Sequence, residues 1–198
     1  MPIISTTTVG FYSESTIKEM FDIIGKYTLI DQEYWVMLKK DKSMAVIGYT
    51  GVRPQDNVGG LYITGVIEFK PTLDISYQDV IPHTKATLQV DGVQINPKIT
   101  RTGQGYLLYY LLVKAGYVII SDNVQYIGGK KLWEKIVRSG KADGIVVRVV
   151  DNGKVVTDTA GNPIDYNGTN IPDNQIWNQP SADPNKSKRY VVLVAKNM

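Results

Sequence analysis

The sequence predicts an α+β protein with a mixed, mostly antiparallel, twisted sheet that is flanked by helices. Two observations lead to this fold class. Between residues 34 and 69, strand-like segments follow one another with only short turn signals between them, which is typical of an antiparallel meander. Between residues 86 and 195, the order is strand, glycine-rich turn, helix, strand, helix and two further strands, which adds helices to the sheet.

The first predicted helix spans Thr16–Ile24. Its apolar residues recur at the spacing of one helical face, Thr16 and Glu19 have the spacing of a capping box, and Gly25 suits the end of the helix. Three predicted strands follow, separated by turn-forming segments at residues 40–43 and 56–60. These strands are residues 34–38, 44–49 and 61–69.

The segment Ala86–Ile95 alternates between apolar and polar residues and is predicted to be extended. Asp91 and Gly92 within it fit two structures, a bulge inside one strand or a tight hairpin turn between two short strands. We favour the single strand because each arm of the hairpin would contain only about four or five residues, close to the lower limit for a strand.

The other predicted elements are two apolar helices and three strands. They are helices at residues 104–115 and 129–138, and strands at 117–121, 145–150 and 190–195. The strand at 117–121 is apolar almost throughout, as expected of a strand that is buried on both faces. Residues 151–188 are rich in Gly, Asn, Asp and Pro, and we expect a long polar loop within a single domain of residues 1–198.

The composition excludes several classes of site. The 198 residues carry a net charge of +3, which is too small to indicate a nucleic acid or an anionic membrane as a partner. The chain has no cysteine and a single histidine, His83, so no disulfide, thiolate nucleophile or histidine-cluster metal site is expected. No apolar run approaches the length of a membrane span, and the first residues lack the pattern of a signal peptide. We therefore expect a cytoplasmic protein.

Gly103 and Gly105 form a glycine-rich turn that opens the first apolar helix. Such a turn presents backbone N–H groups together with the positive end of the helix dipole, so it is a candidate site for a phosphate or pyrophosphate. Arg101 would add a charge-assisted contact. A P-loop is excluded because no Lys-Ser/Thr pair follows the glycines, and a dinucleotide-binding loop is disfavoured because Leu108 replaces its third glycine. A tight turn without a ligand stays open as the alternative.

Three motifs follow one another around this turn. They are Val93-Gln94-Ile95-Asn96-Pro97, then Thr100-Arg101-Thr102-Gly103-Gln104-Gly105, and then Leu108-Tyr109. This arrangement resembles the GNAT superfamily of N-acetyltransferases, in which a strand ending near proline leads to a Gln/Arg-x-x-Gly-x-Gly/Ala loop and a helix. The resemblance extends over about residues 88–150, where Gly128-Gly129 and Leu132-Trp133 are also similar to acetyltransferase-like proteins of bacteriophages. Arg101 stands one place later than the family's basic residue.

The resemblance implies a GNAT-like fold, acetyl-CoA as co-substrate and an unknown amine as acceptor. It implies that backbone amides near the start of the helix hold the coenzyme pyrophosphate and that a splayed strand holds the pantetheine and acetyl group. The residues that it assigns to coenzyme A are Val93, Ile95, Arg101, Gly103, Gln104, Gly105, Tyr106 and Leu107.

Acetyl transfer also needs a base for the amine and an acid for the leaving thiolate. By the resemblance, Asp91 lies where a carboxylate is frequent, and Glu68 on the preceding strand is a second candidate for the base. The family's frequent tyrosine acid falls at Trp133, which cannot donate this proton. Tyr126 and Tyr109 are the candidates that could replace it.

Two functions follow from these observations. The first is an acyl-CoA-binding N-acetyltransferase-like protein, which the strand, loop and helix favour. The second is a non-catalytic GNAT-fold phage protein with a virion-structural or host-interaction role, located in the host cytoplasm or the virion. The displaced Arg101, the tryptophan at position 133 and the long segment at residues 151–188, which suits a protein partner, favour the second function.

Overall fold

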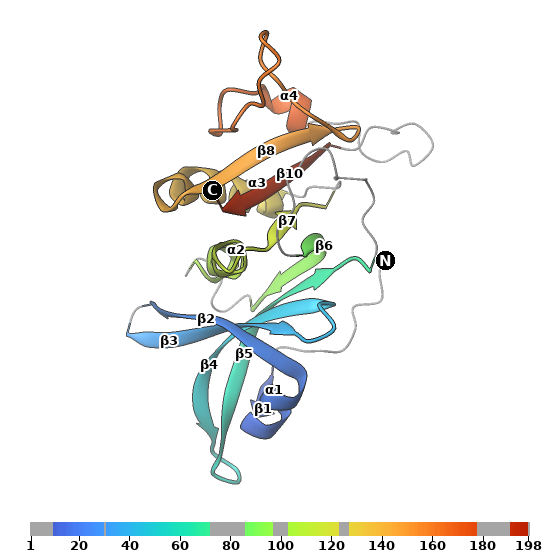
Figure 1. Ribbon diagram of the computed structural model, residues 1–198. Coiled ribbons are helices and arrows are strands. Elements are labelled where there is room, and N and C mark those ends of the chain that lie inside the picture. The colour runs from blue at the N-terminus through green and yellow to red at the C-terminus, as the bar shows by residue number, and fades with distance from the viewer. Residues whose placement is uncertain are drawn as a thin grey trace. The chain divides into compact units, whose positions relative to one another are not determined.

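The computed structural model describes residues 10–29, 31–71, 86–96, 103–122, 127–177 and 191–197. Within these residues the chain is a mixed α+β structure whose strand pairings are mostly antiparallel (Figure 1). This agrees with the predicted class at its coarse level. The chain divides into two compact units, residues 1–69 with 92–111, and residues 70–91 with 112–198.

The first unit is built on an antiparallel meander. Its strands are β1 (Phe11–Ser13), β2 (Phe21–Leu29), β3 (Gln32–Lys39), β4 (Met44–Arg53) and β5 (Val58–Phe69). Each of β2 to β5 pairs with the next along the chain, and β1 pairs with β5. The three strands predicted between residues 34 and 69 are therefore confirmed, although β4 and β5 are longer than predicted because their hairpin turn is tight.

The first helix differs from its prediction. Helix α1 spans Glu14–Met20, and its cap is Ser13, whose hydroxyl accepts the N–H of Thr16 at 3.3 Å. The predicted cap at Thr16 and the predicted continuation to Ile24 are wrong. The chain turns into β2 at Phe21 because β3 offers it a strand to pair with, over eight register positions. Phe21 nevertheless packs in the same apolar cluster as Ile17, so the apolar pattern indicated burial correctly and the helix end incorrectly.

The sheet of the first unit has two different faces. One face carries the cluster around Met37, Val46 and Val66, together with α1. On the other face lies α2 (Gln104–Lys114), whose Leu111 side chain packs at 3.2 Å over the position where a Cβ of Gly25 would stand. A larger residue at position 25 would push the helix from the sheet, so Gly25 serves close packing rather than the end of a helix.

The second unit contains the one parallel pair among the described strands. Of β6 (Thr87–Ile95), residues 87–91 belong to this unit and the rest belong to the first. The other elements of the unit are β7 (Val118–Ile120), α3 (Ile127–Gly140), a short 3-10 turn (Lys141–Asp143), β8 (Ile145–Asp151), β9 (Lys154–Val155), α4 (Asp173–Ile176) and β10 (Val191–Asn197). β6 pairs with β7 in parallel, and β10 lies between β7 and β8, antiparallel to both. β6 is a single strand through Asp91 and Gly92, so the hairpin alternative is wrong.

The segment after β8 is more ordered than the predicted surface loop. Up to Trp177 it contains β9, α4 and a bridge between Arg148 and Asp165, and the side chains of Tyr166, Ile171 and Ile176 are buried. These residues pack this segment as a part of the second unit. Residues 178–188 of the predicted loop lie outside the described residues. No helix in the part of the chain that the structure describes is long and apolar enough to cross a membrane.

Candidate functional site

Strand β6 changes its environment halfway along. Its register with β7 runs from Thr87, opposite Val118, to Gln89, opposite Ile120. Leu88, Gln89 and Val90 are buried, whereas Asp91, Val93 and Gln94 are exposed. The pairing with β7 therefore ends at Gln89, just before the part of β6 whose residues are exposed.

Thr64 links the end of β6 to the start of α2. Its carbonyl oxygen accepts the N–H of Asn96 at 2.8 Å, and its hydroxyl lies 2.7 Å from Oε1 of Gln104. Thr64 is one extra residue of β5 that has no partner in the register with β4, between the pairs Ile47↔Gly65 and Gly48↔Ile63. The irregularity lets this one side chain leave the regular pleat and reach the helix. Asn96 and Gln104, which flank the segment that carries Arg101, thus both form a hydrogen bond with Thr64.

The amide of Gln104 is incompletely satisfied. Gln104 is 1% exposed, and its Nε2 has no acceptor among the described residues. The Thr64 hydroxyl also lies 3.2 Å from the carbonyl of Ile47, but it has one proton and can donate to only one of these oxygens. Whichever way the Gln104 amide is turned, one of its polar atoms stays without a partner. A buried group of this kind is costly unless a ligand or water completes it.

The start of α2 has the geometry of an anion site. Gly103 has a φ of 92°, in the region that favours glycine, and its carbonyl accepts the N–H of Leu107 at 3.1 Å to close the first helical turn. The amides of Gln104 and Gly105 lie in that turn, where a helix supplies no acceptor of its own. The first turn contains no acidic residue that would repel an anion. Arg101, the predicted charged contact, lies outside the described residues.

The other predicted coenzyme residues fall into two groups. Ile95 packs against Gly65, where a Cβ would collide with its side chain, and Leu107 is 4% exposed, so both side chains belong to the core. Val93 is 39% exposed and Tyr106 is partly exposed, its ring stacked on that of Tyr110 at 5.6 Å. The accessible part of the predicted site is therefore the outer half of β6 and the first turn of α2.

Of the predicted catalytic residues, Asp91 belongs to the second unit and Glu68 to the first. Asp91 is exposed at the point where β6 leaves its buried part. Glu68 pairs with Met44 and lies on the face of β5 that carries Val66, opposite to the face on which α2 packs. Tyr126 lies outside the described residues. Trp133 is 1% exposed, so the side chain at the position of the family's tyrosine is part of the core of the second unit.

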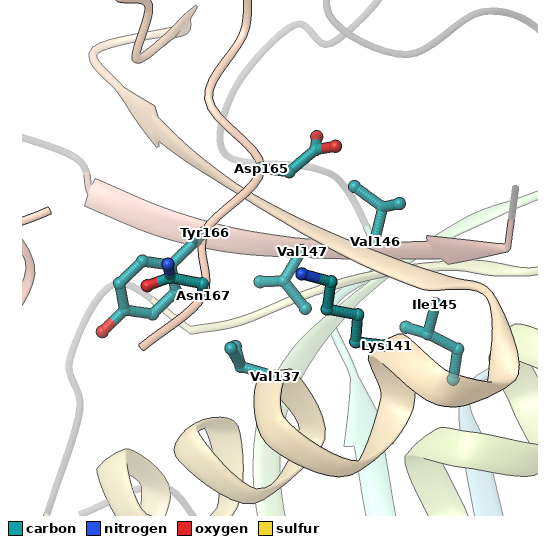
Figure 2. A pocket seen from close by; sticks show the side chains of 8 residues that line it. All are labelled: Val137, Lys141, Ile145, Val146, Val147, Asp165, Tyr166 and Asn167. Carbon is teal, nitrogen blue, oxygen red and sulfur yellow. The ribbon is translucent and has the colours of Figure 1, made fainter. Parts of the chain in front are cut away.

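A shallow pocket elsewhere in the second unit contains none of the predicted site residues. It lies between α3, β8 and the segment at residues 165–167, and Figure 2 shows an apolar floor with the Tyr166 hydroxyl pointing away from the other lining side chains. Burial raises the pKa of Tyr166, and the Trp177 indole opposes this shift although it makes no hydrogen bond of normal geometry with the hydroxyl. The pocket marks where the segment after β8 packs on α3.

Sequence reasoning missed Thr64. A glycine in a strand interior often marks a bulge or a close approach, so Gly65 next to it was the available signal.

A comparison with protein-family models finds no match to this chain, and a comparison with curated proteins finds no significant match. Function must therefore be inferred from the geometry of the site itself.

Proposed function

We propose that this protein binds an acyl-coenzyme A in the manner of the GNAT superfamily, with the pyrophosphate at the first turn of α2 and the pantetheine along the outer half of β6. The observation that carries the proposal is the start of α2. A glycine in the left-handed region, a first turn without acidic residues and a buried Gln104 amide lacking a partner occur there together. The glycine turn and the absence of acidic residues suit a bound anion, and the Gln104 amide, oriented as in the structure, has an N–H donor left for an oxygen acceptor.

The chain order supports a GNAT-like fold. From β6 the order is strand, glycine-opened helix, parallel strand, helix, strand and closing strand, as the resemblance implies. The register of the parallel pair ends at Gln89, and the exposed residues that follow begin at Asp91. The edge of a strand can bind the two amides of pantetheine in the same way as it binds another strand.

We propose N-acetyl transfer as the reaction of this site. The amine nitrogen would form a bond to the acetyl carbon, the thioester C–S bond would break, and the amine would lose a proton to a base. Asp91 is the accessible carboxylate nearest in sequence to the acyl-binding part of β6. Tyr126 stays the predicted acid for the thiolate, because the indole N–H of the buried Trp133 is far too weak an acid to protonate it.

A second function, binding without catalysis, is favoured by Trp133. A protein that descends from an acetyltransferase and has filled the tyrosine position with a core tryptophan keeps the ligand site and loses the proton donor. Such a protein would act through its partners, as in the proposed virion-structural or host-interaction role. Its ligand site would then be a remnant of the ancestral enzyme.

The test is titration of the full chain with acetyl-CoA, followed by calorimetry and by thermal unfolding. We expect binding in wild type and stabilisation by about 2.7 kcal/mol when the ligand is at 100 times its dissociation constant. Gly105→Val should abolish binding, because a side chain there blocks the approach to the first-turn amides. Gly129→Val, at the first turn of α3, is the matched control and should bind normally.

Two outcomes decide between the functions. No heat and no thermal shift at millimolar acetyl-CoA would overturn the binding proposal. Binding without release of free thiol, over a panel of small amines, peptides and aminoglycosides, would support the non-catalytic function. Release of thiol that Asp91→Asn removes, with acetyl-CoA binding retained, would support the enzyme.

A further inference from the structure

A row of five aromatic side chains crosses the sheet of the first unit. The strand register pairs Tyr27 with Tyr34, Tyr34 with Tyr49, Tyr49 with Tyr62, and Tyr62 with Phe11. Directly paired residues place their side chains on the same face of a sheet, so all five lie on one face. Neighbouring strands lie about 4.8 Å apart, so the row extends for about 19 Å across the strands.

Four of the five rings, those of Phe11, Tyr62, Tyr49 and Tyr34, contact one another along the row. Phe11 and Tyr62 meet edge to face at 5.0 Å, Tyr62 and Tyr49 stack at 5.4 Å, and Tyr49 and Tyr34 meet edge to face at 5.9 Å. The Tyr62 hydroxyl donates to the carbonyl of Val52 at 3.2 Å. These contacts hold the rings in fixed positions, which lowers the entropy that a ligand would have to overcome.

Two glycines make room for the rings. A Cβ at Gly51 would lie 2.8 Å from the Tyr62 ring, and a Cβ at Gly60 would lie 2.7 Å from the Phe11 ring. Gly51 and Gly60 are themselves paired in the register of β4 and β5. The rings of Tyr62 and Phe11 therefore lean over neighbouring backbone, where a side chain of any other residue would hold them away from the sheet.

The row differs from the rest of its face. Nearer to α2 the same face carries the fully buried Val36 and Ile47, which are aliphatic. In the row, Tyr27 is 43% exposed, and the other four residues are partly exposed. Aromatic rings that served only as core would be covered in the same way as the aliphatic residues, so the row is a partly accessible surface.

The charges beside the row are balanced. The Arg53 guanidinium lies over the Phe11 ring at 5.1 Å and forms an ion pair with Asp56, which raises the pKa of Arg53 and lowers that of Asp56. Single-stranded nucleic acids stack on aromatic rows too, but their phosphates require an excess of cationic side chains along the groove. This neutral row fits a ligand that is itself uncharged.

We propose that the aromatic row binds a linear, uncharged oligosaccharide. The hydroxyl groups of a sugar can hydrogen-bond to tyrosine hydroxyls along the row, and the C–H face of a pyranose ring can pack on the exposed ring of Tyr27. The spacing of successive rings in the row is comparable with the length of one sugar residue, so a linear glycan can repeat the same contact along it. This site is separate from the acyl-coenzyme A site and does not depend on it.

The test uses the full chain and neutral hexasaccharides of β-1,4-linked glucose, α-1,4-linked glucose, β-1,4-linked N-acetylglucosamine and α-linked mannose. We expect calorimetric binding of at least one of them. Tyr49→Ala, in the middle of the row, should weaken that binding by about tenfold, and Tyr27→Ala, at its exposed end, by about threefold. Val52→Ala is the matched control, since Val52 is 52% exposed on the opposite face of β4.

Circular dichroism and thermal unfolding show whether each variant is folded. If Tyr49→Ala is unfolded, Tyr27→Ala gives the deciding result, because the Tyr27 side chain is the least buried of the row. Binding of none of the four glycans would overturn the proposal, as would equal weakening by Val52→Ala. Two other results would also overturn it by assigning the row to a different partner. One is tight binding of a thymidine 20-mer that Tyr27→Ala removes, and the other is concentration-dependent dimerisation in sedimentation that Tyr27→Ala removes.

Discussion

The two units of this chain cover their strands in different ways. In the second unit, the described residues of β7 and most of those of β8 and β10 are buried, in continuous runs of Val, Ile and Leu. In the first unit, the sheet is covered beside α1 and α2 and is partly open along the aromatic row. A strand that is buried on both faces contributes mainly stability, whereas a partly open, rigid face is available for recognition.

Each unit also contains a buried hydroxyl that joins strands. Ser121 of the second unit is 1% exposed, accepts the N–H of Leu193 at 2.9 Å and donates to the carbonyl of Asp122 at 2.8 Å. Thr64 of the first unit joins β5 to Gln104, whose amide stays incompletely satisfied. The hydroxyl in the second unit has both its hydrogen bonds, whereas the contact made by Thr64 leaves Nε2 of Gln104 without an acceptor among the described residues.

The largest expected effect is in the core of the second unit. Trp133→Ala should lower the free energy of unfolding by about 3–5 kcal/mol, because it removes a fully buried indole and leaves a cavity. Chemical denaturation measures this change. Lys131→Ala, an exposed position on the same helix, is the control and should change stability by less than about 0.5 kcal/mol. A small effect of Trp133→Ala would mean that the indole is not a core group.

The two buried hydroxyls should differ in what their loss affects. Ser121→Ala leaves the buried N–H of Leu193 without its acceptor and should cost about 1–3 kcal/mol of stability, with acetyl-CoA binding unchanged. Thr64→Val should cost about 1–2 kcal/mol and should also weaken acetyl-CoA binding, because it releases Gln104. Thr50→Val, on the exposed part of β4, is the control for Thr64. If Ser121→Ala and Thr64→Val bind acetyl-CoA equally well, Thr64 has no part in the ligand site.

The turn before α2 should show a smaller effect. Gly103→Ala should destabilise by about 1 kcal/mol, because alanine is strained at a φ of 92°. Gly92→Ala meets nothing within 4 Å, and its φ is not in the left-handed region, so it should leave stability unchanged or raise it slightly. Thermal unfolding compares the two variants, and a stabilising Gly103→Ala would contradict the described turn.

The smallest effect is expected at the β3–β4 turn and depends on pH. The Lys39 ammonium and the Ser43 hydroxyl and N–H lower the pKa of Asp41 from 3.8 to about 2. Because the folded-state pKa is the lower one, the stabilisation is present above pH 3.8 and is lost as the pH falls through about 2. Solvent screening at this exposed turn limits it to less than about 1 kcal/mol. Asp41→Asn should remove that part of the acid dependence in denaturation curves between pH 2 and 4.

Sequence periodicity predicted the second unit better than the first. The predicted strand at residues 117–121 and the predicted helix at residues 129–138 lie within about two residues of β7 and α3. These elements are defined by local patterns, which a sequence displays directly. Strand β2 was missed because its first residues continue the apolar spacing of α1, and only pairing with β3 shows where the helix ends.

The candidate site was predictable in its backbone and not in its side chains. Gly103 predicts a left-handed turn followed by the start of a helix, and the structure has both. Thr64 and Gln104 are 40 residues apart, and nothing local in either position indicates that they meet. The aromatic row is non-local too, because Tyr27, Tyr34, Tyr49 and Tyr62 align only once the register of four strands is fixed.

We propose that the first turn of α2 and the outer half of β6 bind acyl-coenzyme A. The most direct test of this site is a two-dimensional amide NMR spectrum of the uniformly labelled chain, recorded during titration with acetyl-CoA. We expect the largest shifts at the amides of Gln104 and Gly105, followed by those of residues 91–95. Shifts that centre on other residues, or no shifts at millimolar acetyl-CoA, would contradict it.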